Sequence, residues 1–312
     1  MVYFFGHSKY IIYISNKNLE KITPKSPKKM KKIVFIFLFF ATISMSSFSQ
    51  ISDLEKNALI DLYQSTNGEN WNTTWDLNED ASTWYGISIE NNTVTKIDLR
   101  VNNLDGIIPS TIGNLTSLQE LNLAFNKIGG AIPSEIVSIK SLQSIKLFIN
   151  QIEGEIPSNI GELQNLRELE LFNNLITGNL PASIYNLTEL QILHLSSNKL
   201  TGSIDKAIEN LQHLTVLSLF DNTMYGSIPD QVGNLSELKE LTLANNLFEG
   251  EVPYSFSKLS KLETLLLTNN RFIGKLSESI KNLPKLKNLE YNNEKESNKF
   301  SNSISQLIIQ PQ

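Results

Sequence analysis

Apolar residues recur at fixed intervals along most of the chain, beginning at Val94. Each interval is 24 residues long and reads LxxLxLxxNxLxGxIPxxIGNLxx, as in the segment LRELELFNNLITGNLPASIYNLTE. The LxL alternation predicts a short strand whose leucines face inward and whose intervening side chains face outward. One unit has no partner for its apolar positions, so only the stacking of successive units buries them. The pattern therefore predicts eight stacked coils over residues 94–285.

Asparagine, glycine and proline keep the same period. The asparagine at position nine follows the strand, where a short amide can satisfy backbone groups of the turn and of the next coil, so we expect a ladder. The glycine permits a turn with positive φ, and the Ile-Pro step keeps the backbone extended. Asp205 and Ser277 replace the proline in two units, which we expect to affect only the local turn. The predicted ladder consists of Asn102, Asn126, Asn150, Asn174, Asn198, Asn222, Asn246 and Asn270.

The LxGxIP half of the unit resembles the extracellular, plant-type leucine-rich repeat. The resemblance covers residues 94–285 and fades in residues 286–312, which we interpret as a degenerate ninth repeat and a C-terminal cap. It implies an α/β repeat solenoid, a right-handed superhelix with a parallel β-sheet on the concave face and a helical N-terminal cap. A second short strand is implied at the LxGxIP half of each unit.

Residues 50–93 are the predicted N-terminal cap. Ser52 and Glu55 have the spacing of a capping box, which predicts a helix that ends at Asn67-Gly68. The predicted apolar helix face comprises Leu54, Ala58, Leu59, Leu62 and Tyr63. The segment resembles the N-terminal cap of the same family, which often carries a cysteine pair that this chain lacks. We interpret the cluster of Trp71, Trp75, Trp84 and Tyr85 as the structural core of the cap; an aromatic sugar platform is the alternative.

The first 49 residues have the sequence features of an export signal. The motif KKMKK precedes eleven apolar or small residues at 33–43, and Ser47 and Ser49 have small-x-small spacing. These features predict a signal peptide over residues 30–49 with cleavage near Ser49/Gln50, and the apolar run is too short for a membrane anchor. Residues 1–29 are interpreted as a non-native extension; a membrane-proximal segment at residues 3–14 is the alternative. We expect a secreted, periplasmic or cell-surface protein of bacterial type, with no membrane span in the mature chain.

Charge and composition exclude several function classes. Residues 1–49 hold eight lysines and one glutamate, so residues 50–312 carry 19 basic and 31 acidic side chains, and this acidic balance disfavours a nucleic-acid partner. The chain has no cysteine and three histidines, which leaves little for a metal site. It also lacks the common nucleotide-binding and catalytic motifs. We expect a monomer with no cofactor, no metal and no enzymatic activity.

Positions three, five, seven and eight of each unit are expected to face the concave side or its edge, with adjacent coils about 4.8 Å apart. Apolar residues concentrate there in coils two to six, and an exposed patch with aromatic anchors is typical of a binding surface. The alternative is that the phenylalanines pack only on one another. The candidate apolar residues are Phe125, Phe148, Ile149, Phe172, Ile192, Val216 and Phe220.

A polar row accompanies the apolar patch. Lys146, Glu170 and His194 are predicted lateral neighbours, beside Glu168. One hypothesis makes Glu170 and His194 an acid–base pair, or a pH-sensitive contact in which the histidine pKa is raised. The alternative is an exposed polar row. Because an open face excludes little water, we expect polar binding contacts and no catalysis.

These features together predict an exported, non-enzymatic recognition module that binds a protein or peptide on the concave face. The family resemblance implies protein interaction, as in receptor ectodomains and secreted inhibitors. A surface or matrix adhesin that acts through weak multivalent contacts is the alternative function.

Overall fold

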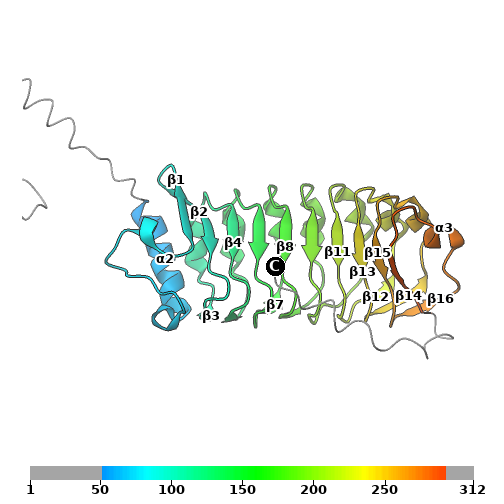
Figure 1. Cartoon of the computed structure of the whole chain (residues 1–312), viewed down its shortest axis with the longest axis horizontal. Coiled ribbons are helices and arrows are strands. Elements are labelled where there is room, and N and C mark those ends of the chain that lie inside the picture. Colours follow the sequence, from blue (N-terminus) through cyan, green and yellow to red (C-terminus); the bar gives the residue numbers. More distant parts are fainter. Residues whose placement is uncertain (1–50, 293–312) are drawn as a thin grey trace, which may run out of the picture. The chain divides into compact units, whose positions relative to one another are not determined.

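The computed structural model describes residues 51–292, which form a stack of coils with one strand of a long sheet in each coil (Figure 1). We number the coils from one, which begins at Val94, in steps of 24 residues. The predicted extension, the signal peptide with its cleavage site, and the tail from residue 293 lie outside the described residues. Within this range no helix has the length and apolar character needed to cross a membrane.

Within residues 51–292 the long sheet has ten strands in the order β1-β2-β4-β6-β8-β10-β11-β13-β15-β17. All neighbours are parallel except β1, which pairs antiparallel with β2 and comes from the N-terminal cap. The register joins residues 24 apart, so Leu169 pairs with Leu193 and Leu193 with Leu217. The parallel sheet expected from the sequence is confirmed, and the β1 hairpin is an addition to it. The strands are β1 (Ile87–Glu90), β2 (Thr93–Asp98), β4 (Glu120–Asn122), β6 (Ser144–Lys146), β8 (Glu168–Glu170), β10 (Ile192–His194), β11 (Val216–Ser218), β13 (Glu240–Thr242), β15 (Thr264–Leu266) and β17 (Asn288–Glu290).

The second strand of the unit forms three small sheets rather than one continuous row. Glycines at position thirteen have the positive φ expected of them, for example 77° at Gly178 and 79° at Gly202. The sheets pair β3 (Asp105–Ile107) with β5 (Lys127–Gly129), β7 (Glu153–Glu155) with β9 (Leu175–Thr177), and β12 (Tyr225–Ser227), β14 (Leu247–Glu251) and β16 (Arg271–Ile273).

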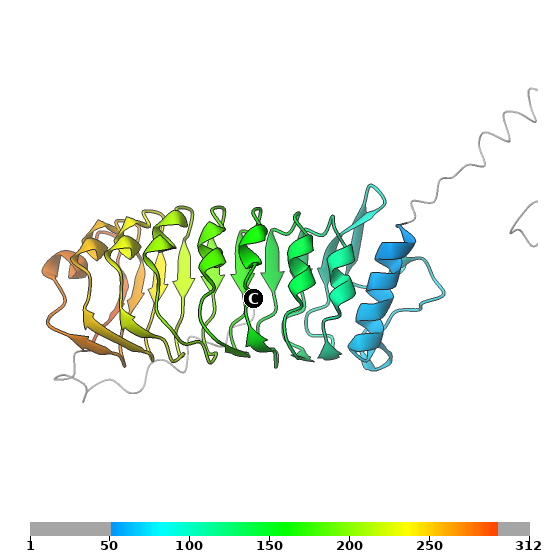
Figure 2. The same cartoon turned by 180° about the vertical axis from the view of Figure 1, so that it is seen from behind.

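The side of the coils opposite the long sheet, which we call the outer face, carries one short helical turn per coil (Figure 2). The repeat pattern did not predict these turns. Proline usually precedes the turn, and where it is replaced the new side chain caps the turn instead: Asp205 accepts a hydrogen bond from the Ala207 amide (2.8 Å). Ser277 caps the last turn in the same way. The turns are η4 (Ser110–Asn114), η5 (Ser134–Ser138), η6 (Ile160–Glu162), η7 (Ala182–Asn186), η8 (Lys206–Asn210), η9 (Asp230–Asn234), η10 (Tyr254–Lys258) and α3 (Glu278–Lys281).

The asparagines of position nine form a hydrogen-bonded ladder between the coils. The Asn174 side-chain amide donates to the Leu147 and Leu171 carbonyls (both 3.0 Å), and its oxygen accepts from the Ile152 amide (2.9 Å). The equivalent bonds recur at Asn126, Asn150, Asn198, Asn222, Asn246 and Asn270. Asn102, the first of the column, bonds instead to the backbone of Thr73 in the cap. Each side chain thus joins its own coil to the preceding layer.

The cap helix α2 (Asp53–Ser65) begins with both halves of the capping box formed by Ser52 and Glu55. The other carboxylate oxygen of Glu55 accepts a hydrogen bond from the Val94 amide (3.1 Å), which links the helix to the first repeat strand. Because Glu55 turns inward for this bond, the buried helix face begins there, and Leu54 is 57% exposed. The expectation that Leu54 belongs to the apolar face was wrong. Short helical turns η2 (Gly68–Asn70) and η3 (Ala81–Thr83) complete the cap.

The three tryptophans of the cap are 3–5% exposed and pack against one another. Trp75 stacks on Trp84 (centroids 4.8 Å apart) and meets Trp71 edge-on (4.9 Å). Each indole N–H donates to a backbone carbonyl, those of Thr66, Tyr85 and Asp76. Buried rings with satisfied N–H groups are unsuited to act as a sugar platform, so the structural interpretation holds for all three tryptophans. Tyr85 is 48% exposed and makes no ring contact with them.

Candidate binding face

The sheet face, defined by positions three, five and seven of the coils with position eight at its edge, carries a row of stacked rings. Phe125 meets Phe148 edge-on (centroids 5.2 Å apart), Phe148 stacks on Phe172 (4.4 Å), and Phe172 stacks on His194 (4.2 Å). We call these four residues the aromatic ladder. His194 reaches Phe172 from position five because position seven of its own coil is the small Ser196. Phe125 is 41% exposed and the other three are half-buried, so the ladder is only partly covered by its own members.

Three of the predicted polar residues form an ion cluster beside the ladder. The Lys146 ammonium lies 2.8 Å from a Glu168 carboxylate oxygen and 3.3 Å from one of Glu170. Burial opposes the charge on Lys146, but these two partners outweigh it and raise the pKa. Burial also disfavours the ionised Glu168, yet bonds from Lys146 and Ser144 lower its pKa. Glu170 lies deeper, and burial raises its pKa. The single ammonium offsets one of the two carboxylate charges.

The hypothesis of an acid–base pair between Glu170 and His194 is not supported by the geometry. Their backbones are paired neighbours in strands β8 and β10, but within the described residues no hydrogen bond or ion pair joins the two side chains. Burial lowers the pKa of His194 to about 4, opposite to the raised pKa expected from the sequence. The imidazole is therefore neutral at pH 7 and acts as a further ring of the ladder.

Acidification is expected to destabilise the protein through His194. Its pKa is about 4 in the folded state and about 6.5 when unfolded, so the unfolded state binds more protons between these values and stability falls as the pH drops. The loss should reach no more than about 3 kcal/mol at pH 4. Chemical denaturation at pH 7 and at pH 4.5 measures it, with His194→Gln as the non-titrating control. An equal loss of stability in both proteins would contradict this role of His194.

The remaining predicted apolar residues are not part of the ladder. Ile192 and Val216 are paired neighbours on strands β10 and β11 and are half-buried. Phe220 is also half-buried but lies beyond the small Ser196. Ser196, Ser218 and Thr242 are linked by hydroxyl–hydroxyl bonds of 2.6 and 2.5 Å and are buried. The aromatic ladder therefore ends at coil five.

Position eight has a backbone conformation that the sequence did not reveal. In coils one to eight its residue has a φ of 53–57°, in the left-handed region that favours glycine and asparagine. Coils four to eight have Asn, Ser or Asp there, whereas the first three have Val101, Phe125 and Ile149. A bulky side chain in this region costs on the order of 1–2 kcal/mol. Phe125 and Ile149 are thus held on the edge of the face in spite of a local conformational cost.

Glu240 was not predicted as a site residue. It follows Val216 in the position-three row, between β11 and β15, and no ion pair to it is present within residues 51–292. Burial raises the pKa of its carboxyl group. The only signal in the sequence was an acidic residue in a column that is apolar in the two preceding coils. No group of three or more metal-ligating side chains is found in the described part of the chain.

Comparisons with known proteins point to the same repeat. Leucine-rich repeat family models match residues 92–152, 164–224, 237–259 and 261–283. Among solved structures, the ectodomain of the receptor kinase GASSHO1/SCHENGEN3 from Arabidopsis thaliana, in complex with CASPARIAN STRIP INTEGRITY FACTOR 2, has 31% identity and a TM-score of 0.72. The match covers 75% of this chain and 29% of that one. A search of curated proteins gave no match.

Two further solved structures share the fold. The Arabidopsis receptor kinase HAESA, in complex with the peptide hormone IDA and the co-receptor SERK1, has 30% identity over 78% of this chain and 42% of that one, with a TM-score of 0.71. A plant ice-binding protein has 25% identity over 72% of this chain and 73% of that one, with a TM-score of 0.65. The chain thus spans less than half the length of the two receptor ectodomains. The 24-residue period, the parallel coil stack and these matches show that the chain belongs to the leucine-rich repeat family.

Proposed function

We propose that this protein is an exported, monomeric recognition module that binds a peptide or a protein segment across its sheet face. The observation that carries the proposal is the aromatic ladder, four rings on adjacent coils with one side open to solvent. Aromatic side chains in such a position supply large contact area at low conformational cost and dominate many interfaces. After removal of the signal peptide the module would be secreted, periplasmic or displayed at the cell surface.

The backbone at position eight favours binding over mutual packing of the rings. If the phenylalanines served only to cover one another, nothing would require Phe125 in a left-handed turn where asparagine or serine occurs in later coils. Backbone strain that persists in spite of its cost is more often found where a side chain serves a ligand. Phe125, the first ring of the aromatic ladder, and Ile149 beside it would carry the binding surface to the edge of the sheet.

The charges on the face indicate the chemistry of the ligand. Glu168 and Glu170 both lie within ion-pair distance of Lys146, whereas Glu240 has a half-buried carboxylate with no ion pair within residues 51–292. A buried charge without a partner is costly, so a cationic group on the ligand would be stabilised there. We therefore expect a ligand with an aromatic or aliphatic side chain over the ladder and a lysine or arginine near Glu240. The receptor ectodomains of similar fold, solved with CASPARIAN STRIP INTEGRITY FACTOR 2 and the peptide hormone IDA, provide precedents for ligand binding.

Replacing Phe148 and Phe172 by aspartate is expected to weaken peptide binding by at least about a hundredfold, since both central anchors are lost. The probe is a random peptide library displayed on phage and selected on the wild-type protein. The enriched peptides are then synthesised and titrated by isothermal titration calorimetry. The selected sequences should combine apolar and basic residues.

The control is Ile107→Asp, which adds one aspartate at an apolar side chain that is 54% exposed outside the sheet face. It should bind the peptides as the wild type does, and circular dichroism should be native in all variants. Full affinity in the Phe148→Asp/Phe172→Asp protein would refute the sheet face as the binding site. The adhesin alternative predicts retention on cells or matrix without any stoichiometric complex.

A further inference from the structure

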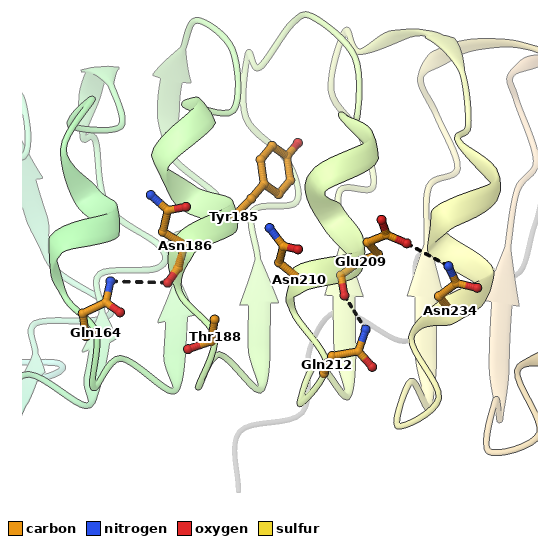
Figure 3. Close-up of a pocket in the computed structure, with 8 residues that line it drawn as sticks. All are labelled: Gln164, Tyr185, Asn186, Thr188, Glu209, Asn210, Gln212 and Asn234. Carbon is orange, nitrogen blue, oxygen red and sulfur yellow. Dashed lines mark hydrogen bonds between the residues drawn. The ribbon is translucent and has the colours of Figure 1, made fainter.

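The outer face contains a groove that is separate from the sheet face (Figure 3). It has a volume of about 800 Å³ and is open to solvent, and its walls come from the outer turns of coils three to six. Tyr185 lies between the outer turns η7 and η8, with Asn186 and Asn210 on either side of it and Thr188 and Gln212 farther along (Figure 3). We call this feature the outer groove.

The groove occurs where the repeat departs from its own pattern. Position twenty is glycine in coils one, three and six. A Cβ atom added at Gly113 would lie only 2.6 Å from the Glu135 carbonyl oxygen, and one added at Gly161 would lie 2.1 Å from the Ser183 carbonyl oxygen. Glycine therefore lets consecutive outer turns approach closely. In coils four and five this position is occupied by Tyr185 and Glu209, whose side chains need space between the turns.

A second residue that departs from the repeat pattern, Asp205, is hydrogen-bonded to Tyr185. The Tyr185 hydroxyl accepts a hydrogen bond from the Asp205 amide (3.0 Å). This N–H exists because aspartate replaces the proline that six other coils have at this position. The tyrosine ring is buried, so it supports the groove from below rather than lining its mouth. Three non-consensus residues, Tyr185, Asp205 and Glu209, thus meet at one place on the outer face.

The groove is lined by hydrogen-bonding groups. Asn186, Asn210 and Thr188 are exposed, and their side chains make no hydrogen bond to another described residue. The Glu209 carboxylate accepts a bond from the Asn234 amide (2.9 Å), and Gln212 donates to the Glu209 carbonyl. Each free amide offers donors and an acceptor side by side, which matches neighbouring hydroxyls of a sugar ring. The carboxylate disfavours an anionic ligand, and the exposed lining offers no large apolar surface for an apolar one.

An exposed aromatic ring adjoins the groove. A smaller hollow of about 430 Å³ shares Asn234 with it and is bordered by Tyr254, whose side chain is 69% exposed. An exposed tyrosine ring can cover the apolar C–H face of a pyranose while amides bind its hydroxyls. The two hollows together would hold more than one sugar unit.

We propose that the outer groove is a binding site for a neutral oligosaccharide, with Asn186, Asn210, Gln212 and Glu209 as hydroxyl partners and Tyr254 as a stacking ring. The site is formed by side chains that the sheet face does not use. Its occupation is therefore compatible with a peptide on the opposite side of the coils. The protein would then link a carbohydrate to a peptide or protein ligand.

The test is a glycan microarray with neutral and acidic oligosaccharides, followed by calorimetric titration of the strongest neutral glycan. The wild type should bind neutral glycans, and Asn210→Ala combined with Gln212→Ala should lower the affinity at least tenfold. Asn114→Ala removes the same repeat asparagine outside the groove and should bind like the wild type. Phe148→Asp/Phe172→Asp should also bind the glycan normally, which separates this site from the sheet face.

Three outcomes would overturn the proposal. These are an absence of binding to any neutral glycan, binding to acidic glycans alone, and unchanged affinity in the Asn210→Ala/Gln212→Ala protein. Both substituted residues are exposed, so the variant is expected to fold, and a native circular dichroism spectrum checks this.

Discussion

Replacing Asn174 by alanine is expected to lower the free energy of unfolding by about 3–5 kcal/mol. The side chain is 6% exposed, and its oxygen accepts the hydrogen bond of the Ile152 amide. The Leu147 and Leu171 carbonyls would each keep a second asparagine partner, from Asn150 and Asn198. The Ile152 N–H would be left buried without an acceptor. The cost combines that unsatisfied donor with the loss of the bonds from the Asn174 amide.

Chemical denaturation followed by circular dichroism measures the change, and amide hydrogen exchange at Ile152 locates it. The matched control is Asn210→Ala, because Asn210 is exposed and its side chain makes no hydrogen bond to another described residue. We expect this control to change stability by less than about 0.5 kcal/mol. If the two alanine variants are equally stable, Asn174 of the asparagine ladder contributes no more to the free energy of unfolding than an ordinary surface asparagine.

Removal of the Trp75 ring is the second large effect that we expect. The indole lies between Trp71 and Trp84 with Tyr63 nearby, and its N–H donates to the Tyr85 carbonyl (2.9 Å). Trp75→Ala leaves a cavity at the centre of this cluster and should cost about 3–5 kcal/mol. Trp75→Phe keeps most of the packing and loses the hydrogen bond, so it should cost about 1–2 kcal/mol.

The Trp75 variants test whether the tryptophan cluster stabilises the N-terminal cap. Denaturant titration gives the stability, and hydrogen exchange shows whether protection is lost first in strand β1 of the cap and in strand β2, which pairs with it. Tyr85→Ala is the control, because the side chain of this neighbouring residue is 48% exposed and makes no ring contact with the cluster, and the substitution keeps the backbone carbonyl that accepts from Trp75. A Trp75→Ala protein as stable as the Tyr85→Ala protein would mean that the tryptophans do not hold the cap together.

The repeat could be predicted from the sequence because its constraints are periodic. A leucine that must be buried in every coil, or an asparagine that must reach the preceding one, leaves a mark every 24 residues. Features that occur once leave no such mark. The β1 hairpin depends on how one segment of the cap meets β2, and the exposure of Leu54 depends on Glu55 bonding to Val94 some 39 residues away.

The repeat positions that form the candidate site could be predicted from the sequence, but the contacts between their side chains could not. Positions three, five and seven are on the sheet face as expected, so Phe148 and Phe172 are correctly placed as neighbours. The stacking of His194 on Phe172 could not be read from these columns, because it crosses from position five to position seven and requires a small residue at Ser196. The pKa of His194 follows from that packing, which is why the predicted direction of its shift was wrong.

The asparagine ladder also separates two kinds of evolutionary change. The bonds that it makes between repeat coils recur at fixed spacings, such as 22 and 27 positions, so duplication or loss of one whole coil in the gene would recreate them without redesign. The residues of the sheet face are not needed for these bonds and can mutate one at a time. A lineage could therefore lengthen the molecule by recombination and change its ligand by point mutation, with little interference between the two processes.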